Sequence, residues 1–302
     1  MEHETRRYSI LIVDDDPMVC RLFEELCRRT GHDSASARNG AEALESMKAR
    51  RFDMVISDIR MPVMDGFELF RHLETNAPGV KRVLMTGGDI DEYLSLVKRY
   101  NIGNILPKGG DFSAMEMMDY IGSLLTGNVF GLSKYFPRAS VTMRTVRSCA
   151  DTGRITQDII TSYPVKEAVF LEMAIDELIS NAVFHGVLKM SGINREQWRA
   201  DYQIEHGDSI NVSWAVDAEK IGVCVEDPAG NLRKSDVLRW LNHGPEEELA
   251  EGEHGRGLLL IRKIIDRFII NIDPGKKTEC IILQYKNRAR IPRVKPILIH
   301  EL

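Results

Sequence analysis

The sequence has no long apolar run, and no segment approaches the roughly 18 consecutive apolar residues that a membrane-spanning helix needs. Its first residues, MEHETRRYSI, also lack the apolar core of a secretory signal peptide. These two absences predict a cytoplasmic protein without a membrane partner.

Cysteine is scarce, and an excess of basic charge is missing. The 302 residues include five cysteines, which form no C-x-x-C pair and no cluster with histidine. This pattern predicts free thiols and argues against a disulfide framework or a zinc site. The net charge is −5, and the one basic cluster, within residues 286–295, is expected to be a solvated tail. A direct nucleic-acid partner is therefore not expected.

The first 125 residues alternate apolar strands with segments of helical period five times. The expected strands are Ile10–Val13, Ser34–Ala37, Met54–Ser57, Arg82–Met85 and Asn104–Leu106. This alternation predicts an α/β fold, a doubly wound five-stranded parallel sheet with helices on both faces. In such a sheet the chemistry lies at the carboxyl ends of the strands.

Carboxylates gather at two of these strand ends. Asp14–Asp16 follow the first strand, and Asp58 follows the third. Because neighbouring strand ends converge, we expect these acids within a few ångströms of one another, where repulsion raises the pKa of at least one. A hard divalent cation such as Mg²⁺ relieves that repulsion. Lys108 after the fifth strand and Thr86 after the fourth add an ammonium and a hydroxyl, a set suited to phosphoryl transfer onto Asp58.

Four segments, ILIVDDDP, VISDIRMPVMDG, VLMTGG and ILPKGG, resemble the landmarks of response-regulator receiver domains, over residues 8–125. The resemblance implies that Asp58 is the phosphoacceptor, that Thr86 and Lys108 bind the phosphoryl oxygens as catalytic residues, and that the partner upstream is a histidine kinase. The Mg²⁺ ligands that it implies are Asp14, Asp15, Asp58 and the backbone carbonyl of Arg60.

Two positions depart from that family. Gly109 follows Lys108 where the family usually has proline with a cis peptide, and Ile105 stands where many members have an aromatic switch residue. Because a cis bond before a non-proline residue costs about 3 kcal/mol, we expect the Lys108–Gly109 peptide to be trans.

The second half of the chain has a different order of elements. Residues 126–140 contain three helix breakers and are expected to be a linker, although the aromatic residues in it favour packing against a surface. Helices and hairpin-linked strands follow over 141–286, which predicts a two-layer α+β sandwich. Residues 231–254 are expected to be a polar, flexible segment, and residues 287–302 a C-terminal tail.

Polar residues and glycines in this half suggest a nucleotide site. Glu177 and Asn181 share one helix face, where an amide is suited to hold Mg²⁺ and a carboxylate to accept a proton. Asp227 ends a strand just before Gly230, and Thr278 begins the last strand of this half. Gly255 and Gly257 precede a helix, where backbone amides can approach phosphates.

Four segments resemble the sequence boxes of Bergerat-fold ATPases: IDELISNAVFHG, EDPAG, HGRGLLLIRKIID and PGKKTECIIL. Within that superfamily, their residues are most similar to those of the anti-sigma serine kinases. The resemblance implies ATP and Mg²⁺ as cofactors, Asn181 as Mg²⁺ ligand and Glu177 as general base. It places Asp227 and Thr278 at the adenine. The lid hinge over the phosphates would be formed by Gly255 and Gly257. Ala229 stands where the family has a glycine, and two alternatives stay open: Gly230 replaces that glycine, or adenine binding is altered.

Three functions remain open. The first is a serine/threonine kinase that acts on an antagonist protein of an anti-sigma system, under control of Asp58 phosphorylation. The second is a binding module that sequesters a sigma factor or its antagonist and uses ATP only as a conformational ligand. The third is an ATP sensor with an unrelated partner. A homodimer is compatible with each. A histidine kinase is not expected, because no histidine lies between His72 and His185.

Overall fold

The computed structural model describes residues 6–109, 112–163, 168–188, 202–204, 208–241, 256–286 and 295–302. The chain divides into two compact units, Met1–Val129 and Phe130–Leu302. Within the described ranges, no helix combines the length and apolar character needed to cross a bilayer.

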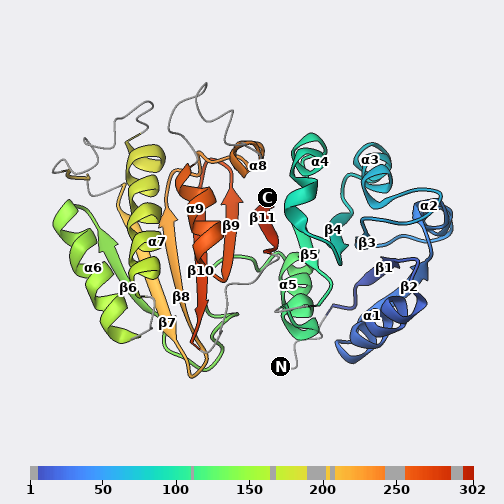
Figure 1. Ribbon diagram of the computed structural model, residues 1–302, viewed down its shortest axis with the longest axis horizontal. Helices are drawn as coiled ribbons and strands as arrows, with labels where there is room; N and C mark the ends of the chain where they lie inside the picture. Colours follow the sequence, from blue (N-terminus) through green and yellow to red (C-terminus); the bar gives the residue numbers. More distant parts are fainter. Residues whose placement is uncertain are drawn as a thin grey trace. The chain divides into compact units, whose positions relative to one another are not determined.

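The first unit has five parallel strands in the order β2-β1-β3-β4-β5. The strands are β1 Ser9–Val13, β2 Asp33–Ala37, β3 Met54–Asp58, β4 Lys81–Thr86 and β5 Asn104–Pro107. The helices are α1 Pro17–Arg29, α2 Gly40–Ala49, α3 Gly66–Asn76, α4 Leu94–Arg99, which follows a 3₁₀ turn at Ile90–Tyr93, and α5 Ala114–Thr126. In Figure 1, α1 and α5 cover one face of these strands and the other three helices cover the opposite face. The predicted doubly wound parallel sheet is confirmed.

Local sequence explains these elements. Every residue of β3 is buried, as expected of a strand covered on both faces, and its first three residues, Met54–Ile56, are all apolar. Asp65 and Ser113 begin α3 and α5 with capping boxes, in which the cap side chain and a glutamate three residues later exchange hydrogen bonds with the backbone. Pro17 in the first turn of α1 fixes a backbone angle that the helix needs.

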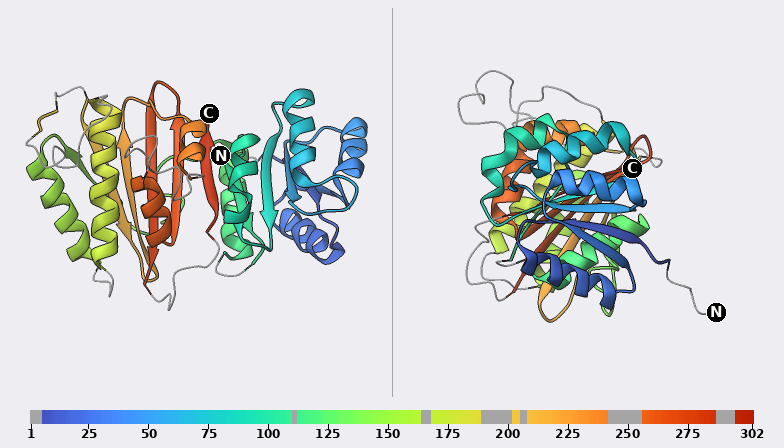
Figure 2. Two further views of the ribbon diagram at one scale, coloured as in Figure 1. Left: turned by 45° about the horizontal axis from the view of Figure 1, so that its top comes forward. Right: turned by 90° about the vertical axis from the view of Figure 1, so that its right-hand side faces the viewer.

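The second unit has six strands in the order β11-β9-β10-β8-β7-β6. The strands are β6 Thr142–Val146, β7 Ile210–Val216, β8 Lys220–Asp227, β9 Arg267–Asp273, β10 Lys277–Tyr285 and β11 Ile297–Glu301. The helices are α6 Cys149–Ser162, α7 Ala168–Asn181 with a π-helical turn Ala182–Val187, α8 Lys234–Leu241 and α9 Arg256–Ile264. Neighbouring strands are antiparallel except β9 and β11, which are parallel. Figure 2 shows α6, α7 and α9 on one face of the strands, so the predicted two-layer α+β sandwich is confirmed.

Two expectations for this unit were wrong. Part of the segment expected to be flexible forms α8, because Val237, Leu238 and Leu241 recur at helical spacing and are buried. The expected C-terminal tail ends in β11, whose residues Ile297–His300 are buried beside β9, so the apolar run ILI belongs to the core.

Residues 130–140 lie within the second unit and are packed, as their apolar composition suggested. Leu132 and Phe136 are both 2% exposed. The described peptide bonds include no cis bond, so the prediction of a trans Lys108–Gly109 peptide is confirmed.

Candidate functional sites

Three carboxylates meet at the ends of β1 and β3 in the first unit. Asp14 follows β1 and is fully buried, Asp15 is exposed, and Asp58 is the last residue of β3. One oxygen from each lies within 4.8 Å of the others. Lys108 Nζ lies 2.5 Å from Asp14 Oδ2 and 2.9 Å from Asp58 Oδ1. The structure thus brings together Asp14, Asp15, Asp58 and Lys108, which we call the acidic cluster. Asp16, also expected there, instead caps α1.

Burial governs the charges of the acidic cluster. It raises the pKa of Asp14, although the hydrogen bond from Lys108 opposes that rise. Burial also acts against the charge on Lys108, but its bonds to Asp14 and Asp58 outweigh burial, so the pKa of Lys108 is raised. Lys108 therefore stays protonated and neutralises only part of the charge of three carboxylates.

The acidic cluster fits a divalent cation. Oxygen ligands at this spacing, with one carboxylate open to water, match the preference of Mg²⁺ for carboxylates plus retained waters. A cation there would offset the negative charge that Lys108 leaves unpaired. The role of the Arg60 carbonyl stays a prediction.

A backbone hydrogen bond joins the ends of β4 and β5 beside the acidic cluster. The Lys108 amide donates to the Thr86 carbonyl at 2.7 Å, and the Thr86 hydroxyl accepts from the Gly88 amide at 3.0 Å. Behind Asp58, the Gly66 amide donates to the Ile59 carbonyl at 3.0 Å. A Cβ at position 66 would overlap the carbonyl oxygen of Asp58, so the start of α3 requires glycine.

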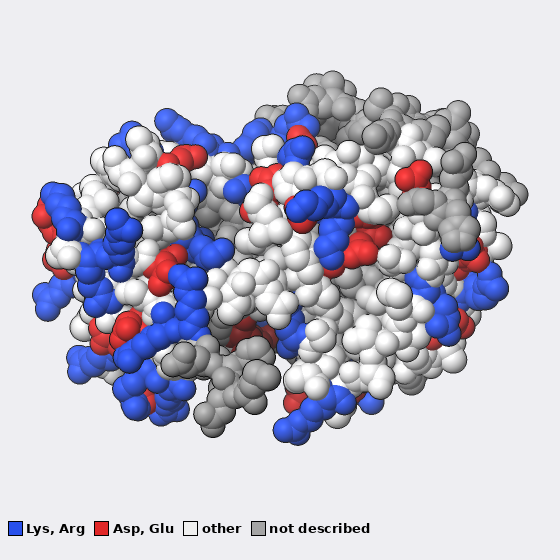
Figure 3. Space-filling view, turned by 180° about the vertical axis from the view of Figure 1, so that it is seen from behind, with Lys and Arg blue, Asp and Glu red and all other residues white. Residues whose placement is uncertain are grey.

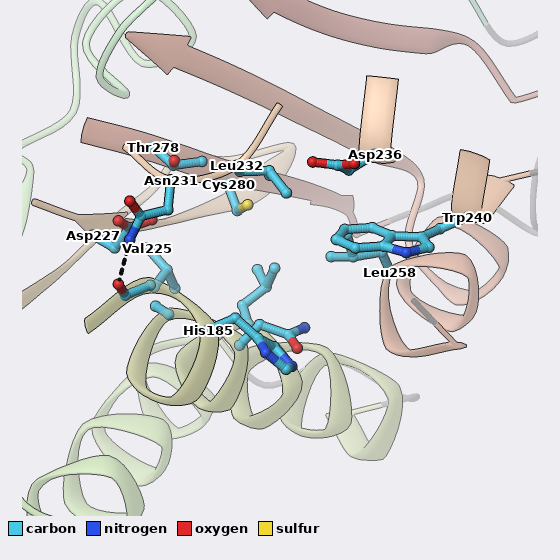
Figure 4. Close-up of a pocket in the computed structure, with 14 residues that line it drawn as sticks. His185, Val225, Asp227, Asn231, Leu232, Asp236, Trp240, Leu258, Thr278 and Cys280 are labelled. Atoms are coloured by element: carbon cyan, nitrogen blue, oxygen red, sulfur yellow. Dashed lines mark hydrogen bonds between the residues drawn. The ribbon is translucent and has the colours of Figure 1, made fainter. Parts of the chain in front are cut away.

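A cavity of about 240 Å³ opens in the second unit between α7, α8, α9 and the strands β8 and β10 (Figure 4). It is lined by Leu178, Asn181, Ala182, His185, Gly186, Val225, Asp227, Asn231, Leu232, Asp236, Trp240, Leu258, Thr278 and Cys280. Three of the six residues expected to bind ATP are in this set: Asn181, Asp227 and Thr278. A mostly apolar pocket with a few convergent polar groups is the usual form of a small-ligand site.

Asp227 is the buried acid of this cavity, and strand pairing places Thr278 beside it. The two residues are cross-strand partners in the antiparallel pair of β8 and β10. Burial raises the pKa of Asp227, while bonds from the amides of Ala229 and Gly230 to its Oδ1, at 3.0 and 3.1 Å, oppose the rise. The Asp227 carboxylate is thus held as a fixed acceptor at one end of the cavity.

Ala229 leaves this arrangement intact although the resembling family has glycine there. The Ala229 amide donates to Asp227, and its backbone has no positive φ. Gly230 does not line the cavity. It packs against the β9–β10 turn, where its carbonyl accepts from the Gly275 amide at 3.0 Å. Gly230 therefore supports Asp227 from behind.

Glu177 and Asn181 face each other on α7, as their spacing predicted. The Asn181 Nδ2 donates to Glu177 Oε1 at 3.3 Å. Glu177 also lies against the start of α9, where a Cβ at position 257 would overlap its carboxylate. Gly257 therefore lets α9 begin directly on Glu177, while its expected part in a lid hinge stays a prediction. Gly255 lies outside the described residues.

Several residues that line the cavity were not predicted from the sequence. Asp236 and Trp240 lie one turn apart on α8, which was expected to be irregular. Asn231 Nδ2 donates to the Gly186 carbonyl at 2.9 Å, a bond that ties the end of α7 to the loop after β8. Alternation along β10 was an available signal, since Cys280 follows Thr278 by two residues and points to the same face.

Family models match both units. Residues 10–119 match the response regulator receiver domain, and residues 139–285 match the histidine kinase-like ATPase domain. The transcriptional regulatory protein ZraR of Klebsiella oxytoca is 34% identical over 110 residues, which are 36% of this chain and 25% of that protein. The response regulator receiver protein Anae109_2439 of Anaeromyxobacter sp. is 38% identical over 103 residues, 34% of this chain and 42% of that protein. The chain thus spans less than half the length of these relatives.

Solved structures give partial matches. The response regulator protein TrrA of Thermotoga maritima, in complex with Mg(2+)-BeF, is 27% identical, with 38% of this chain and 98% of that chain covered and a TM-score of 0.34. The chemotaxis response regulator CheY4 of Vibrio cholerae is 23% identical, with 41% and 97% covered and a TM-score of 0.33.

Proposed function

Because the chain joins a response regulator receiver domain to a histidine kinase-like ATPase domain, we propose that it is a two-component response regulator whose output domain is an ATP-dependent serine/threonine kinase of the anti-sigma type. An upstream histidine kinase phosphorylates Asp58, and that modification controls the output domain. The kinase transfers phosphate from ATP to a separate antagonist protein in a partner-switching system.

The acidic cluster supports Asp58 as phosphoacceptor. Asp58 ends its strand beside a half-buried lysine, Lys108, that it shares with Asp14, so the charge that develops on a transferring phosphoryl group meets an ammonium already in place. Mg²⁺, held by Asp14, Asp15, Asp58 and the Arg60 carbonyl, would supply charge neutralisation. Thr86 and Lys108 would hold the phosphoryl oxygens.

The cavity of the second domain supports ATP as the ligand. Asp227 is an acceptor suited to an adenine amino group, and Thr278 lies opposite it. Asn181 lines the same cavity from α7 and would hold the Mg²⁺ of Mg·ATP. The apolar side chains of Leu178, Val225 and Leu258 complete a lining suited to a flat base.

One observation favours transfer over binding alone: the Glu177 carboxylate is held between the Asn181 amide and Gly257. A carboxylate beside a metal-ligating amide is placed to accept a proton from an attacking hydroxyl. A module that only binds ATP needs no such base. The second candidate, sequestration of a sigma factor or its antagonist, is favoured by the closeness of Asp227, Asn181 and Thr278, since these account for binding without Glu177.

The two functions separate in a transfer assay. The protein is incubated with labelled Mg·ATP and antagonist proteins from neighbouring genes, with and without phosphorylation of Asp58. Glu177→Gln is expected to keep ATP affinity and lose transfer by a factor of about 10². Asn181→Ala is expected to weaken Mg·ATP binding itself, since a metal ligand is lost.

Glu172→Gln is the matched control, because Glu172 is an exposed glutamate on the same helix. Undiminished transfer in Glu177→Gln would reject Glu177 as the base. No transfer by the unaltered protein to any antagonist, together with tight ATP binding, would favour the sequestering module.

A further inference from the structure

Strand β10 has two faces with different partners. Thr278 and Cys280 point into the cavity, while Lys277 and Glu279 alternate with them and point to the opposite face. On that opposite face lies the segment 130–136, which we call the strap. The strap follows α5 of the receiver domain after only three residues, 127–129.

The strap is held on β10 by a charged residue that is almost completely buried. Glu279 is 3% exposed, and its Oε2 accepts from the Gly131 amide at 2.7 Å. Its Oε1 accepts from Lys277 Nζ at 2.7 Å. The ring of Phe130 lies 4.3 Å from the same Nζ, in a cation–π contact. Loss of the strap would therefore remove a backbone donor from a buried carboxylate and an aromatic ring from its counterion.

The bond network extends from β10 to the neighbouring strands. Lys277 Nζ also bonds Glu226 Oε2 at 3.0 Å, and Glu226 Oε1 accepts from Asn211 Nδ2 at 3.1 Å. Glu226 directly precedes Asp227 on β8, and Glu279 directly follows Thr278 on β10. Both cavity residues proposed to bind the base are thus flanked in sequence by members of the network under the strap.

We propose that Glu279 is a positioning residue for the nucleotide site, through which the strap sets how tightly the cavity binds nucleotide. A strap seated on Glu279 fixes the backbone of β10 and with it the side chain of Thr278. A strap drawn away by the chain from α5 leaves Glu279 and Lys277 to rearrange, and the rearrangement shifts the opposite face of the same strand. This inference rests on the proposed nucleotide site and names the route of its regulation.

Coupling of this kind is reciprocal, because any effect of the strap on nucleotide affinity requires an equal effect of nucleotide on strap docking.

The test uses the full chain and ADP as the probe. ADP affinity is measured by calorimetry, and exchange of the Gly131 amide is measured with and without ADP. Glu279→Ala is expected to weaken ADP binding about tenfold, a coupling typical of residues in one bonded network.

Three further variants make the test specific. Glu279→Gln keeps an acceptor for the Gly131 amide and is expected to restore part of the affinity. Phe130→Ala leaves β10 intact, is expected to weaken ADP binding in the same direction, and keeps the proposal testable if Glu279→Ala fails to fold. Glu219→Ala makes the same chemical change as Glu279→Ala on an exposed turn and is expected to bind ADP normally.

The outcomes distinguish a failure of positioning through the strap from a failure of the nucleotide site itself. Protection of the Gly131 amide by ADP, with weakened affinity in Glu279→Ala or Phe130→Ala, supports positioning through the strap. Normal ADP affinity in both variants, or exchange of Gly131 unchanged by ADP, overturns it while the nucleotide site stands. No ADP binding by the unaltered protein overturns the nucleotide site and this inference with it.

Discussion

The acidic cluster and the cavity of the second unit hold their buried aspartates in opposite ways. In the receiver domain, Asp14 and Asp58 share the ammonium of Lys108, so charge is balanced by a side chain at an open strand end. In the cavity of the ATPase domain, Asp227 is held by the backbone amides of Ala229 and Gly230. The lysine-paired carboxylates suit a reaction in which negative charge develops on a transferred group. The carboxylate held by backbone amides suits recognition of a neutral donor such as an adenine amino group.

The two sites also differ in the solvent exposure of their polar residues. Asp15 of the acidic cluster is exposed, whereas Asp227 and Thr278 are buried in their cavity. On the face of the molecule in Figure 3, basic and acidic side chains are interspersed. Exposure of Asp15 to solvent therefore distinguishes the acidic cluster from the cavity of the second unit.

The largest expected effect tests the receiver site alone. Asp58→Asn is expected to abolish phosphorylation by acetyl phosphate, because an amide cannot accept the phosphoryl group. ADP affinity of the ATPase domain is expected to stay unchanged when no phosphodonor is present. Mass spectrometry of the intact protein reports the added phosphate, and Glu74→Gln, an exposed surface change, is the control. A phosphate retained on the Asp58→Asn protein would contradict the assignment.

The next effect tests the ATPase site through a residue that is not itself an acid. Gly257→Ala is expected to displace the Glu177 carboxylate and lower phosphoryl transfer about 10²-fold, as much as Glu177→Gln does. Helix stability is not expected to suffer, since alanine favours helices over glycine by about 1 kcal/mol. Combining both substitutions should add little further loss, because both act on one carboxylate. Fully multiplied losses in the double variant would show that Gly257 acts elsewhere.

Gly66→Ala is the counterpart in the receiver domain, and we expect it to act on folding. The added Cβ meets a backbone oxygen, which cannot move aside as the end of a glutamate side chain can. Overpacking of this kind costs about 1–3 kcal/mol of unfolding free energy. Denaturant unfolding measures the loss, and Gly79→Ala, where a Cβ meets nothing within 4 Å, is the control. Equal stability of the two variants would contradict the close approach of α3 to Asp58.

The smallest effect concerns a lysine in the strap. Burial lowers the pKa of Lys134 from 10.5 to about 8, although Glu279 opposes that change. Between these values the unfolded chain holds a proton that the folded protein lacks, so this lysine makes stability rise with pH. Lys134→Met is expected to be more stable than the unaltered protein at pH 7, and its advantage should shrink from pH 8 to 10.5. Parallel thermal denaturation across that range checks it, and an advantage independent of pH would refute the shift.

Much of the receiver domain follows from its sequence, because a parallel sheet converts order along the chain into position in space. Once Asp14, Asp58, Thr86 and Lys108 are each placed after a strand, their meeting at one edge follows from the topology. The ATPase domain is less predictable from sequence. Asp227 and Thr278 lie side by side because of the register between β8 and β10. The sequence of α8 was interpreted as a polar segment, and only the structure shows that one face of this helix is buried.

The sequence by itself determined the two folds, the strand-end carboxylates and the helical pairing of Glu177 with Asn181, since these depend on local periodicity and on spacing along one element. Only the tertiary structure decided that β11 joins the second domain's strands, that Trp240 and Asp236 line the cavity, and that the strap lies on Glu279. Those contacts join residues far apart in the chain, and burial of their side chains depends on which surfaces meet. No local sequence pattern predicts these contacts, because a short apolar or charged segment can have the same sequence whether it faces solvent or packs on another strand.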